Sequence, residues 1–463
     1  MLDTPLSTFG QTSATPAPAN RMMDAFAADF RDGIDINLGV GYVNEEAIPR
    51  DRIAHAMRAV LDQPQRYRAS LNYGGPVGSP NLVRSLRDFL IGHAIGQLNT
   101  DVLDRCRLII GASGASSILD AFAQLLPTGI VITTDPAYYI FSDLLQRVGH
   151  RVIAVPEDEH GIDPDAVRAA LHQLGDDRRH VRFFYIATVN NPSCTILSND
   201  RRRALTATGA ELTNTLGRAV PMLFDTAYEL LIHDPTVTPV ESVLLHDEAG
   251  IAYEIGTLSK ILAPALRVGY VIGSDGPLID ALVQRNCDVG FSAPLINQEI
   301  ASYLLDNHIG DQLVASHRTY HDKAQRVGRW IDQHLGPYLE STSGGRAGFY
   351  HYLTFRDIET HEDAPFFKHP SRTTGDPAVD GRTDQRHPRV VFIPGAFCVH
   401  PDGQMTQIAR RQLRISYGYE PADRIHTALQ LMAEAAAWVS GQRDNISRPH
   451  HRPAHTTEQG VNG

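Results

Sequence analysis

The sequence predicts an α/β protein with a large, mostly parallel sheet flanked by helices and a smaller α+β domain after it. Two features of the 463-residue chain support this prediction. Short β-rich runs that are apolar almost throughout alternate with amphipathic stretches, as expected where helices cover both faces of a parallel sheet. The sequence also changes character near residue 310, and a chain of this length commonly forms two or three domains.

The apolar runs of the predicted large sheet are short and are separated by stretches with helical periodicity. They lie at residues 107–110, 130–133, 151–155, 182–187, 221–224 and 268–272. Between the first two runs, apolar residues recur at helical spacing, namely Ile118, Leu119, Phe122, Leu125 and Leu126. Because strands and helices alternate in this way, we expect residues 51–310 to form the large domain.

The remaining domain boundaries follow from local composition. Residues 1–20 are rich in Thr, Pro, Ala and Ser, which predicts a mobile arm, and residues 21–50 form a separate N-terminal segment. A smaller domain is expected over 311–441, beginning with a long helix and containing a polar insertion at about 357–388. Residues 442–463 are expected to form a disordered tail.

Composition and charge argue against several classes of function. The formal net charge is -11 and no long basic block offsets it, so we expect no nucleic-acid partner. No apolar run approaches the roughly 20 residues that cross a bilayer, and the N-terminus lacks the pattern of a signal peptide. The four cysteines are isolated, which argues against a disulfide framework or a zinc site and favours a cytoplasmic location. The histidines of the insertion are not spaced as ligands, so no metal is expected.

A lysine stands at the centre of the most informative segment, Thr257-Leu258-Ser259-Lys260. Burying an ammonium ion in an apolar setting is costly, and an imine with an aldehyde cofactor would change that balance. The hydroxyls of Thr257 and Ser259, together with Arg267, are donors suited to a nearby phosphate monoester. Taken alone, the segment could equally be an interface lysine beside an ordinary loop.

Polar side chains also follow two of the predicted strands upstream of Lys260. Asp225 ends one strand, Tyr228 lies three residues later, and Asn191-Pro192 follows another strand. The carboxyl ends of parallel strands face the crevice in which such sheets bind ligands. There Asp225 would pair with a protonated pyridine nitrogen, and Tyr228 and Asn191 would contact a phenolic oxygen of the ring. A helix cap for Asp225 and a plain turn for Asn191-Pro192 are the alternatives.

Three further segments carry weaker signals of the same kind. Ser113, Gly114 and Ala115 belong to a loop of small residues that opens a predicted helix, where backbone N–H groups and the helix dipole favour a phosphate. Tyr138 follows another strand and would stack on a flat heterocycle. Arg414 lies on a β-like run, and its planar guanidinium suits a substrate carboxylate.

In order, these segments resemble the class I/II aminotransferases, the pyridoxal 5′-phosphate (PLP) enzymes of fold type I that are related to aspartate aminotransferase. The resemblance covers residues from about 37 to 418. The Lys260 segment resembles the family's S-x-S-K-x-x-A-P-G-x-R-x-G-Y signature, which is highly specific. Asn191-Pro192 resembles its N-P-[ST]-G turn, Asp225 to Tyr228 its D-x-x-Y motif, and Arg414 its R-[LI]-S strand.

The resemblance implies an exchange of amino groups between an L-amino acid and a 2-oxo acid, with PLP as cofactor. Lys260 would bind PLP as a Schiff base and move the proton, Asp225 would pair with the pyridinium, and Tyr138 would stack on the ring. Asn191 and Tyr228 would hold the phenolic oxygen. The phosphate cup would consist of Ser113, Gly114, Ala115, Thr257, Ser259 and Arg267. The substrate would contact Arg414, Asn191 and Gly39.

The resemblance also implies an assembly and a moving part. Tyr73, in Leu71-Asn72-Tyr73-Gly74, resembles a tyrosine that reaches the phosphate of the partner subunit, which implies a homodimer. Residues 37–41 resemble a mobile N-terminal strand that closes over substrate. Cys194 and Ala265 replace customary glycines, and the backbone at Cys194 is therefore expected to avoid a glycine-only conformation. Arg346 stands where related sequences carry an apolar residue.

Other reactions and roles use the same residues. Elimination at the β or γ carbon, or cyclisation of the aminocyclopropane-carboxylate synthase kind, begins with the same deprotonation. A non-catalytic PLP-sensing domain of a transcription regulator is a further alternative, although we expect no DNA-binding domain ahead of residues 37–41. The amino donor and acceptor are not determined by these motifs.

Overall fold

The computed structural model describes residues 4–382 and 385–447, with side chains as far as residue 441. Its largest unit is an eight-stranded sheet with the strand order β2-β9-β8-β7-β6-β3-β4-β5. The strands are β2 (Cys106–Ile110), β3 (Ile130–Asp135), β4 (Arg151–Asp158), β5 (Gly161–Ile162), β6 (Val181–Ala187), β7 (Met222–Asp225), β8 (Ala252–Thr257) and β9 (Gly269–Ser274). The strands from β8 to β4 are parallel, and antiparallel pairing occurs at the two edges, where β9 lies between β2 and β8 and where the short β5 follows β4. The expected mostly parallel sheet is therefore confirmed.

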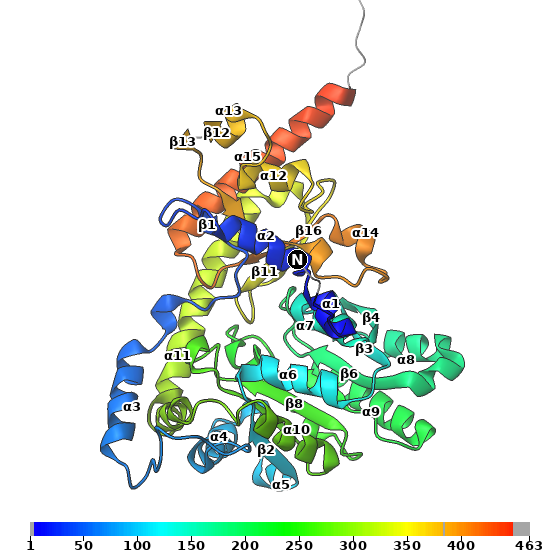
Figure 1. The fold of residues 1–463 in the computed structure, drawn as a ribbon. Helices are drawn as coiled ribbons and strands as arrows, with labels where there is room; N and C mark the ends of the chain where they lie inside the picture. The colour runs from blue at the N-terminus through cyan, green and yellow to red at the C-terminus, as the bar shows by residue number, and fades with distance from the viewer. Residues whose placement is uncertain (1–3, 383–384, 448–463) are drawn as a thin grey trace, which may run out of the picture.

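Helices cover both faces of this sheet (Figure 1). One face packs against α6 (Gly114–Leu125), α7 (Tyr139–Val148) and α10 (Pro277–Asp288). The other packs against a set that includes α4 (Pro80–Gly92), α5 (Thr100–Asp104), α8 (Pro164–Gln173) and α9 (Asn199–Leu216). Phe183 and Tyr185 of β6 enter the first core, whereas Phe184 and Ile186 enter the second. The strands are apolar almost throughout because both of their faces are buried.

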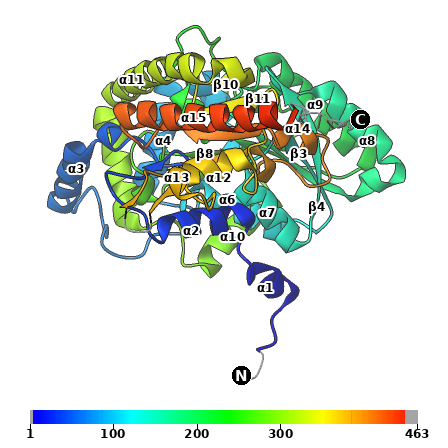
Figure 2. The same ribbon diagram turned by 90° about the horizontal axis from the view of Figure 1, so that it is seen from above.

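The smaller domain is built on a four-stranded antiparallel sheet with the order β10-β11-β16-β15. Its strands are β10 (Leu339–Gly344), β11 (Tyr350–Phe355), β15 (Ile393–Pro394) and β16 (Gln412–Ser416). The short helix α14 (Thr406–Ala409) precedes β16, and α15 (Ala422–Ser447) crosses the top of this domain (Figure 2). The expected α+β character of the second domain is confirmed.

One long helix joins the two domains. The helix expected at the start of the smaller domain is α11, which spans Leu295–His334 and therefore begins 16 residues before residue 311. Apolar residues such as Ile300 and Leu304 continue the buried stripe back to Pro294, the residue that precedes the first turn. The boundary placed between 310 and 311 thus lies inside a helix, and α3 (Arg50–Asp62) packs against the same helix.

The N-terminal residues contain more regular structure than a mobile arm would. Two helices, α1 (Thr8–Ser13) and α2 (Pro18–Ala27), occupy much of this segment. Helix α2 runs along one side of the molecule, and α1 lies at its periphery (Figure 2), where it contacts α7. The chain then forms β1 (Ile36–Asn37), which pairs in parallel with β14 (Val390–Val391) near the small domain.

The polar insertion and the C-terminal segment also differ from an irregular loop and a tail. The insertion contains α12 (Pro365–Ser371), α13 (Pro377–Asp380) and the short pair β12 (Gly381–Arg382) and β13 (Gln385–Arg386). Helix α15 continues past residue 441 to Ser447, and the rest of the expected tail, 448–463, lies outside the described residues. Within the described part of the chain, no helix is both long enough and apolar enough to cross a bilayer.

Candidate active site

The predicted site residues converge on a cavity at the carboxyl ends of β6, β7 and β8. The cavity has a volume of about 140 Å³. Its lining includes nine of the predicted residues, namely Ala115, Tyr138, Asn191, Asp225, Tyr228, Thr257, Ser259, Lys260 and Arg267. Ligands bind at this edge of open α/β sheets because the loops after neighbouring strands diverge there. A larger groove of about 1100 Å³ beside β4 and α8 contains none of the predicted residues.

Lys260 lies just after β8 with its side chain largely buried. Burial lowers the pKa of its ammonium group to about 8, although the nearby Asp225 carboxylate opposes that shift. Its Nζ donates a long hydrogen bond of 3.5 Å to the carbonyl oxygen of Gly41 and lies 5.2 Å from the ring centre of Tyr228. An amine that is desolvated in this way is neutral over more of the physiological pH range, which is the form that attacks a carbonyl carbon.

Asp225 is the last residue of β7, and its carboxylate points into the cavity from the sheet. Oδ2 accepts a hydrogen bond of 2.9 Å from the Tyr185 hydroxyl, and Oδ1 accepts one of 3.0 Å from the Ala227 amide. Burial raises the pKa of this carboxyl group, and these two hydrogen bonds only partly counteract it. A buried carboxylate of this kind favours a cationic N–H partner, which a protonated pyridine ring provides.

The residues predicted to form a phosphate cradle lie at the start of α6 and in the loop before β9. Arg267 donates from Nε to Ser113 Oγ at 3.2 Å and from a terminal nitrogen to the Ser113 carbonyl at 3.0 Å. A Cβ on Gly269 would lie 2.3 Å from the amide nitrogen of Ala115, so only glycine allows β9 to approach α6 this closely. Amides of a first helical turn have no partner within the helix and attract anions.

The structure refines which residues of this cradle face the cavity. The amide of Ser113 donates to Ser117 Oγ at 2.8 Å, and the amide of Gly114 donates to the Arg267 carbonyl at 2.7 Å. Neither Ser113 nor Gly114 lines the cavity, whereas Ala115 and the unpredicted Ser116 do. Because Thr257 Oγ1 donates to Ser259 Oγ at 2.9 Å, these two hydroxyls form one hydrogen-bonded unit beneath the cradle.

Arg414, on β16, is a fully buried cation whose hydrogen-bond acceptors are neutral. One terminal nitrogen donates to Asn191 Oδ1 at 2.8 Å, the other donates to the carbonyl oxygen of Gly39, and Nε has no hydrogen-bond partner among the described residues. The guanidinium carbon also lies 4.2 Å from the ring centre of Tyr350. A buried guanidinium without a carboxylate of its own suits the carboxylate of a ligand.

The comparison with known proteins agrees with this geometry. A family model described as aminotransferase class I and II matches residues 34–359. The chain belongs to this family. It is a PLP-dependent transaminase of fold type I, and the desolvated Lys260, the Asp225 carboxylate and the α6 cradle fit an aldehyde, a pyridine nitrogen and a phosphate respectively.

Individual relatives of this aminotransferase are distant. It is 23% identical over 408 residues to the uncharacterized HTH-type transcriptional regulator YisV of Bacillus subtilis, covering 87% of this chain and 73% of that protein. It is 26% identical over 310 residues to the 2-aminoadipate transaminase of Thermus thermophilus, covering 66% of this chain and 71% of that protein. The multiple substrate aminotransferase from Thermococcus profundus shares the fold, with a TM-score of 0.77, 19% identity, and coverage of 94% of this chain and 98% of that chain.

The predicted Tyr73 does not line the cavity of its own aminotransferase chain. Its side chain is 83% exposed, and its ring lies 6.0 Å from that of Phe291. Leu71 beside it is 78% exposed. These positions leave Tyr73 available to a second subunit, and its role there stays a prediction.

Two departures from the family's motifs can now be placed. Cys194 has φ +53°, which lies in the left-handed region that favours glycine but that other residues also adopt. The amide of Cys194 donates to the Asn190 carbonyl at 2.7 Å, which keeps the turn closed despite the side chain. Arg346 pairs with Asp234 at 2.8 Å and is not part of the cavity lining.

Sequence reasoning missed two tyrosines of the site and the structure that anchors its N-terminal strand. Tyr185 is a buried hydroxyl within an apolar strand, and the need for a hydrogen-bond partner was the signal that could have identified it. Tyr350 lies in the small domain, and the sequence around it matches no motif. Among the described residues, no group of three or more His, Cys, Asp or Glu is arranged to hold a metal ion.

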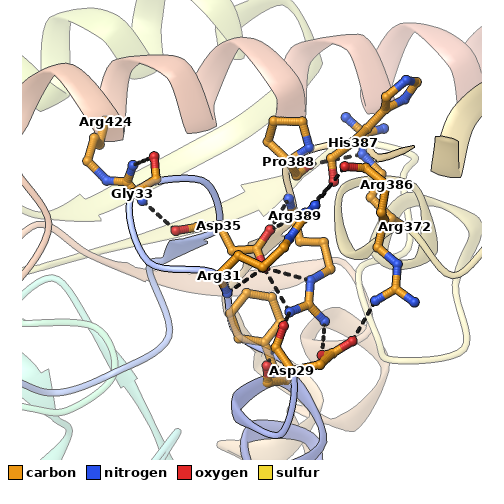
Figure 3. Close-up of polar contacts among 11 residues, drawn as sticks. Asp29, Arg31, Gly33, Asp35, Arg372, Arg386, His387, Pro388, Arg389 and Arg424 are labelled. Carbon is orange, nitrogen blue, oxygen red and sulfur yellow. Dashed lines mark hydrogen bonds and ion pairs between the residues drawn. The ribbon is translucent and has the colours of Figure 1, made fainter. Parts of the chain in front are cut away.

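A network of charged residues, here called the N-terminal clasp, holds the chain before Gly39. It consists of Asp29, Arg31, Asp35, Arg386 and Arg389 (Figure 3). Asp35 accepts from Arg31 at 2.6 Å and from Arg389 at 2.8 Å, while Asp29 pairs with Arg386 and with Arg389 at 2.6 Å each. The clasp therefore joins the N-terminal segment to the end of the polar insertion, immediately before β1 and the Gly39 carbonyl that accepts from Arg414.

Proposed function

We propose that this transaminase moves the amino group of an L-amino acid to a 2-oxo acid with PLP held on Lys260, and that it works as a homodimer. One observation supports the assignment most strongly: a desolvated amine and a desolvated carboxylate line one cavity, and the buried guanidinium of Arg414, which has no acidic partner among the described residues, donates to Asn191 of the same lining. When bound, PLP supplies the aldehyde and an electron-accepting ring. The protein side chains then bind, orient and transfer protons.

Each side chain has a separate task in this proposal. Lys260 Nζ would hold the aldehyde of the cofactor and, as a neutral amine, would accept the proton from the substrate Cα. Asp225 keeps the ring nitrogen protonated, because a buried carboxylate is stabilised by the adjacent N–H⁺. Tyr138 stacks on the ring, and Tyr228 donates to its phenolic oxygen.

Arg414 and Asn191 would orient the substrate. Arg414 binds the α-carboxylate, and Asn191, whose Oδ1 accepts from Arg414, keeps its amide N–H groups for a second acceptor. The Gly39 carbonyl fixes the other terminal nitrogen of Arg414. Held in this way, the substrate would present its Cα–H bond to Lys260, which would lower the barrier through orientation.

A dimer and a cytoplasmic location are supported by surface and thiol chemistry. Leu71 and Tyr73 are both largely exposed, and the ring of Tyr73 contacts that of Phe291, as expected of a surface that a second subunit covers. The four cysteines are all unpaired, which suits a reducing compartment. Tyr73 would then contact the phosphate in the partner's cavity.

The experiment that tests this function is a half-reaction with purified holoenzyme. The enzyme is mixed with single amino acids and no acceptor, and both products are followed by mass spectrometry. Transamination predicts one equivalent each of 2-oxo acid and aminated cofactor, with no free ammonia. Ammonia released over many turnovers would instead show elimination. L-2-aminoadipate belongs in the panel because the Thermus thermophilus relative is named for it.

The similarity to a protein named as a transcriptional regulator supports a second candidate, a domain that binds PLP and an amino acid without turnover. The same half-reaction separates the two. A sensing domain would bind the amino acid and shift the cofactor absorbance, and it would release neither product.

A further inference from the structure

Tyr350 is the first residue of β11, and its side chain lies between two groups of the proposed site. It is fully buried. Its hydroxyl oxygen lies 2.8 Å from the hydroxyl oxygen of Tyr228, and its ring centre lies 4.2 Å from the guanidinium carbon of Arg414. A single side chain therefore contacts both the phenol expected at the cofactor oxygen and the cation expected at the substrate carboxylate.

The N-terminal strand closes over the same side chain. A Cβ on Gly41 would lie 2.7 Å from the Tyr350 hydroxyl oxygen, so a larger residue at position 41 would displace one of the two. The Gly41 carbonyl accepts the long hydrogen bond from Lys260. Tyr350 thus sits where three distant parts of the chain meet, at residues 41, 228 and 414.

We propose that Tyr350 is a positioning residue that acts on the two halves of the site through two different parts of its side chain. Its hydroxyl sets the direction and strength of the hydrogen bond that Tyr228 makes, and its ring holds Arg414 in place. This inference rests on the proposed function, because it assigns Tyr228 to the cofactor and Arg414 to the substrate.

The hydroxyl effect follows from how paired phenols share protons. When Tyr350 donates to Tyr228, the proton of Tyr228 is free to point at the cofactor's phenolic oxygen. A donor that itself accepts a hydrogen bond is polarised and becomes a stronger donor. Without the Tyr350 hydroxyl, Tyr228 stabilises a phenolate oxygen less well, so the cofactor becomes more basic.

The ring effect concerns a cation that must stay charged without an acidic partner. The aromatic face attracts the guanidinium without neutralising it, because the interaction is with the ring quadrupole. A carboxylate at this position would satisfy Arg414 permanently and compete with substrate. The flat ring restricts Arg414 while leaving its N–H groups directed to ligands and to neutral acceptors.

The test compares Tyr350→Phe and Tyr350→Leu with the control Tyr352→Phe. Tyr352 lies two residues along the same strand, opposite Arg414 on β16, but its buried hydroxyl donates to Gln412 Oε1 at 3.1 Å and not to Tyr228. Two quantities are read from the PLP-loaded proteins: the pKa of the cofactor absorbance, and the Kd of 2-aminoisobutyrate, an amino acid without a Cα hydrogen. Thermal unfolding of each variant reports general damage to the fold.

The two variants should separate the two effects. Tyr350→Phe should raise the pKa of the cofactor absorbance by about 0.3 to 0.6 unit and leave the Kd within about twofold of wild type. Tyr350→Leu should show the same shift and a Kd raised roughly three- to thirtyfold. The control Tyr352→Phe should change neither quantity, even where it lowers the unfolding temperature as much.

Specific results would overturn the proposal. A Tyr350→Phe titration within about 0.1 unit of wild type would remove the hydroxyl role, and an unchanged Kd in Tyr350→Leu would remove the ring role. Equal shifts in Tyr352→Phe would show a merely structural origin. Neither readout requires turnover, so a protein that binds PLP but fails to transaminate would refute the proposed function and still decide the role of Tyr350.

Discussion

Asp35 in the N-terminal clasp and Asp225 in the cavity are both buried aspartates, and their pKa values move in opposite directions. Asp35 accepts hydrogen bonds from Arg31 and Arg389, and these hold its pKa well below the ordinary value despite the opposing effect of burial. Asp225 is bonded to a tyrosine hydroxyl and a backbone amide, and burial raises its pKa. The chain therefore neutralises one buried carboxylate with its own cations and leaves the other for a ligand.

The cations of the two regions show the same contrast. Arg389 is paired with Asp29 and Asp35, and its pKa is raised, whereas the pKa of Lys260 is lowered to about 8 by burial. Buried charges that lack a partner are costly, and such costs concentrate at functional sites because ligands remove them. Ion pairs between its own residues thus stabilise the clasp. In the cavity the charged groups are less fully paired, which leaves them to interact with a ligand.

The largest expected effect is on catalysis in Asp225→Asn. Losing the carboxylate should reduce the transamination rate at least about a hundredfold, because the ring nitrogen loses the anion that keeps it protonated. The free energy of unfolding of the cofactor-free protein should stay within about 1 kcal/mol of wild type, since relief of the buried charge offsets a weakened hydrogen bond. Steady-state kinetics and chemical denaturation measure the two quantities. If Asp225→Asn instead lost much stability and kept normal activity, Asp225 would have a structural role like that of Asp35.

The second expected effect is on stability in Asp35→Asn. Removing this charge leaves the buried Arg389 with one half-exposed carboxylate, Asp29, as its anionic partner among the described residues, and should cost about 2 to 4 kcal/mol at neutral pH. Because the folded pKa of Asp35 is depressed, its contribution is present above the unfolded pKa and is lost as pH falls through the folded value. The difference in the free energy of unfolding between Asp35→Asn and wild type should therefore become smaller below about pH 4.

A matched control sharpens this second prediction. Asp29 bonds the same Arg389, but its side chain is 53% exposed, so Asp29→Asn should cost less than about 1 kcal/mol. Urea denaturation at several pH values measures both variants. Equal losses in Asp29→Asn and Asp35→Asn would show that burial does not set the strength of the clasp.

The same contrast explains what could be predicted from the sequence. The strands are short apolar runs, so their hydrophobic pattern predicted them. Lys260, Asp225 and Asn191 belong to local motifs, so the resemblance to a known family identified them. The clasp pairs residues 35 and 389, which are 354 positions apart, and no local pattern specifies such a contact. The same holds for Tyr350, whose partners Tyr228 and Arg414 meet only in the folded chain. The left-handed backbone at Cys194 was missed because the turn holds it against the preference of the side chain.

The central claim is that Lys260, which forms no salt bridge among the described residues, binds PLP, and borohydride trapping tests this claim most directly. The chain has three lysines, Lys260, Lys323 and Lys368, and Lys323 is also buried with a pKa lowered to about 8, but it donates to the Gly418 carbonyl at 2.8 Å. Cofactor-free protein is mixed with PLP at several pH values, reduced at timed intervals, digested and mapped by mass spectrometry. We expect the adduct on Lys260, forming faster as pH rises through about 8. An adduct chiefly on Lys323 or Lys368, or none at all, would contradict the account.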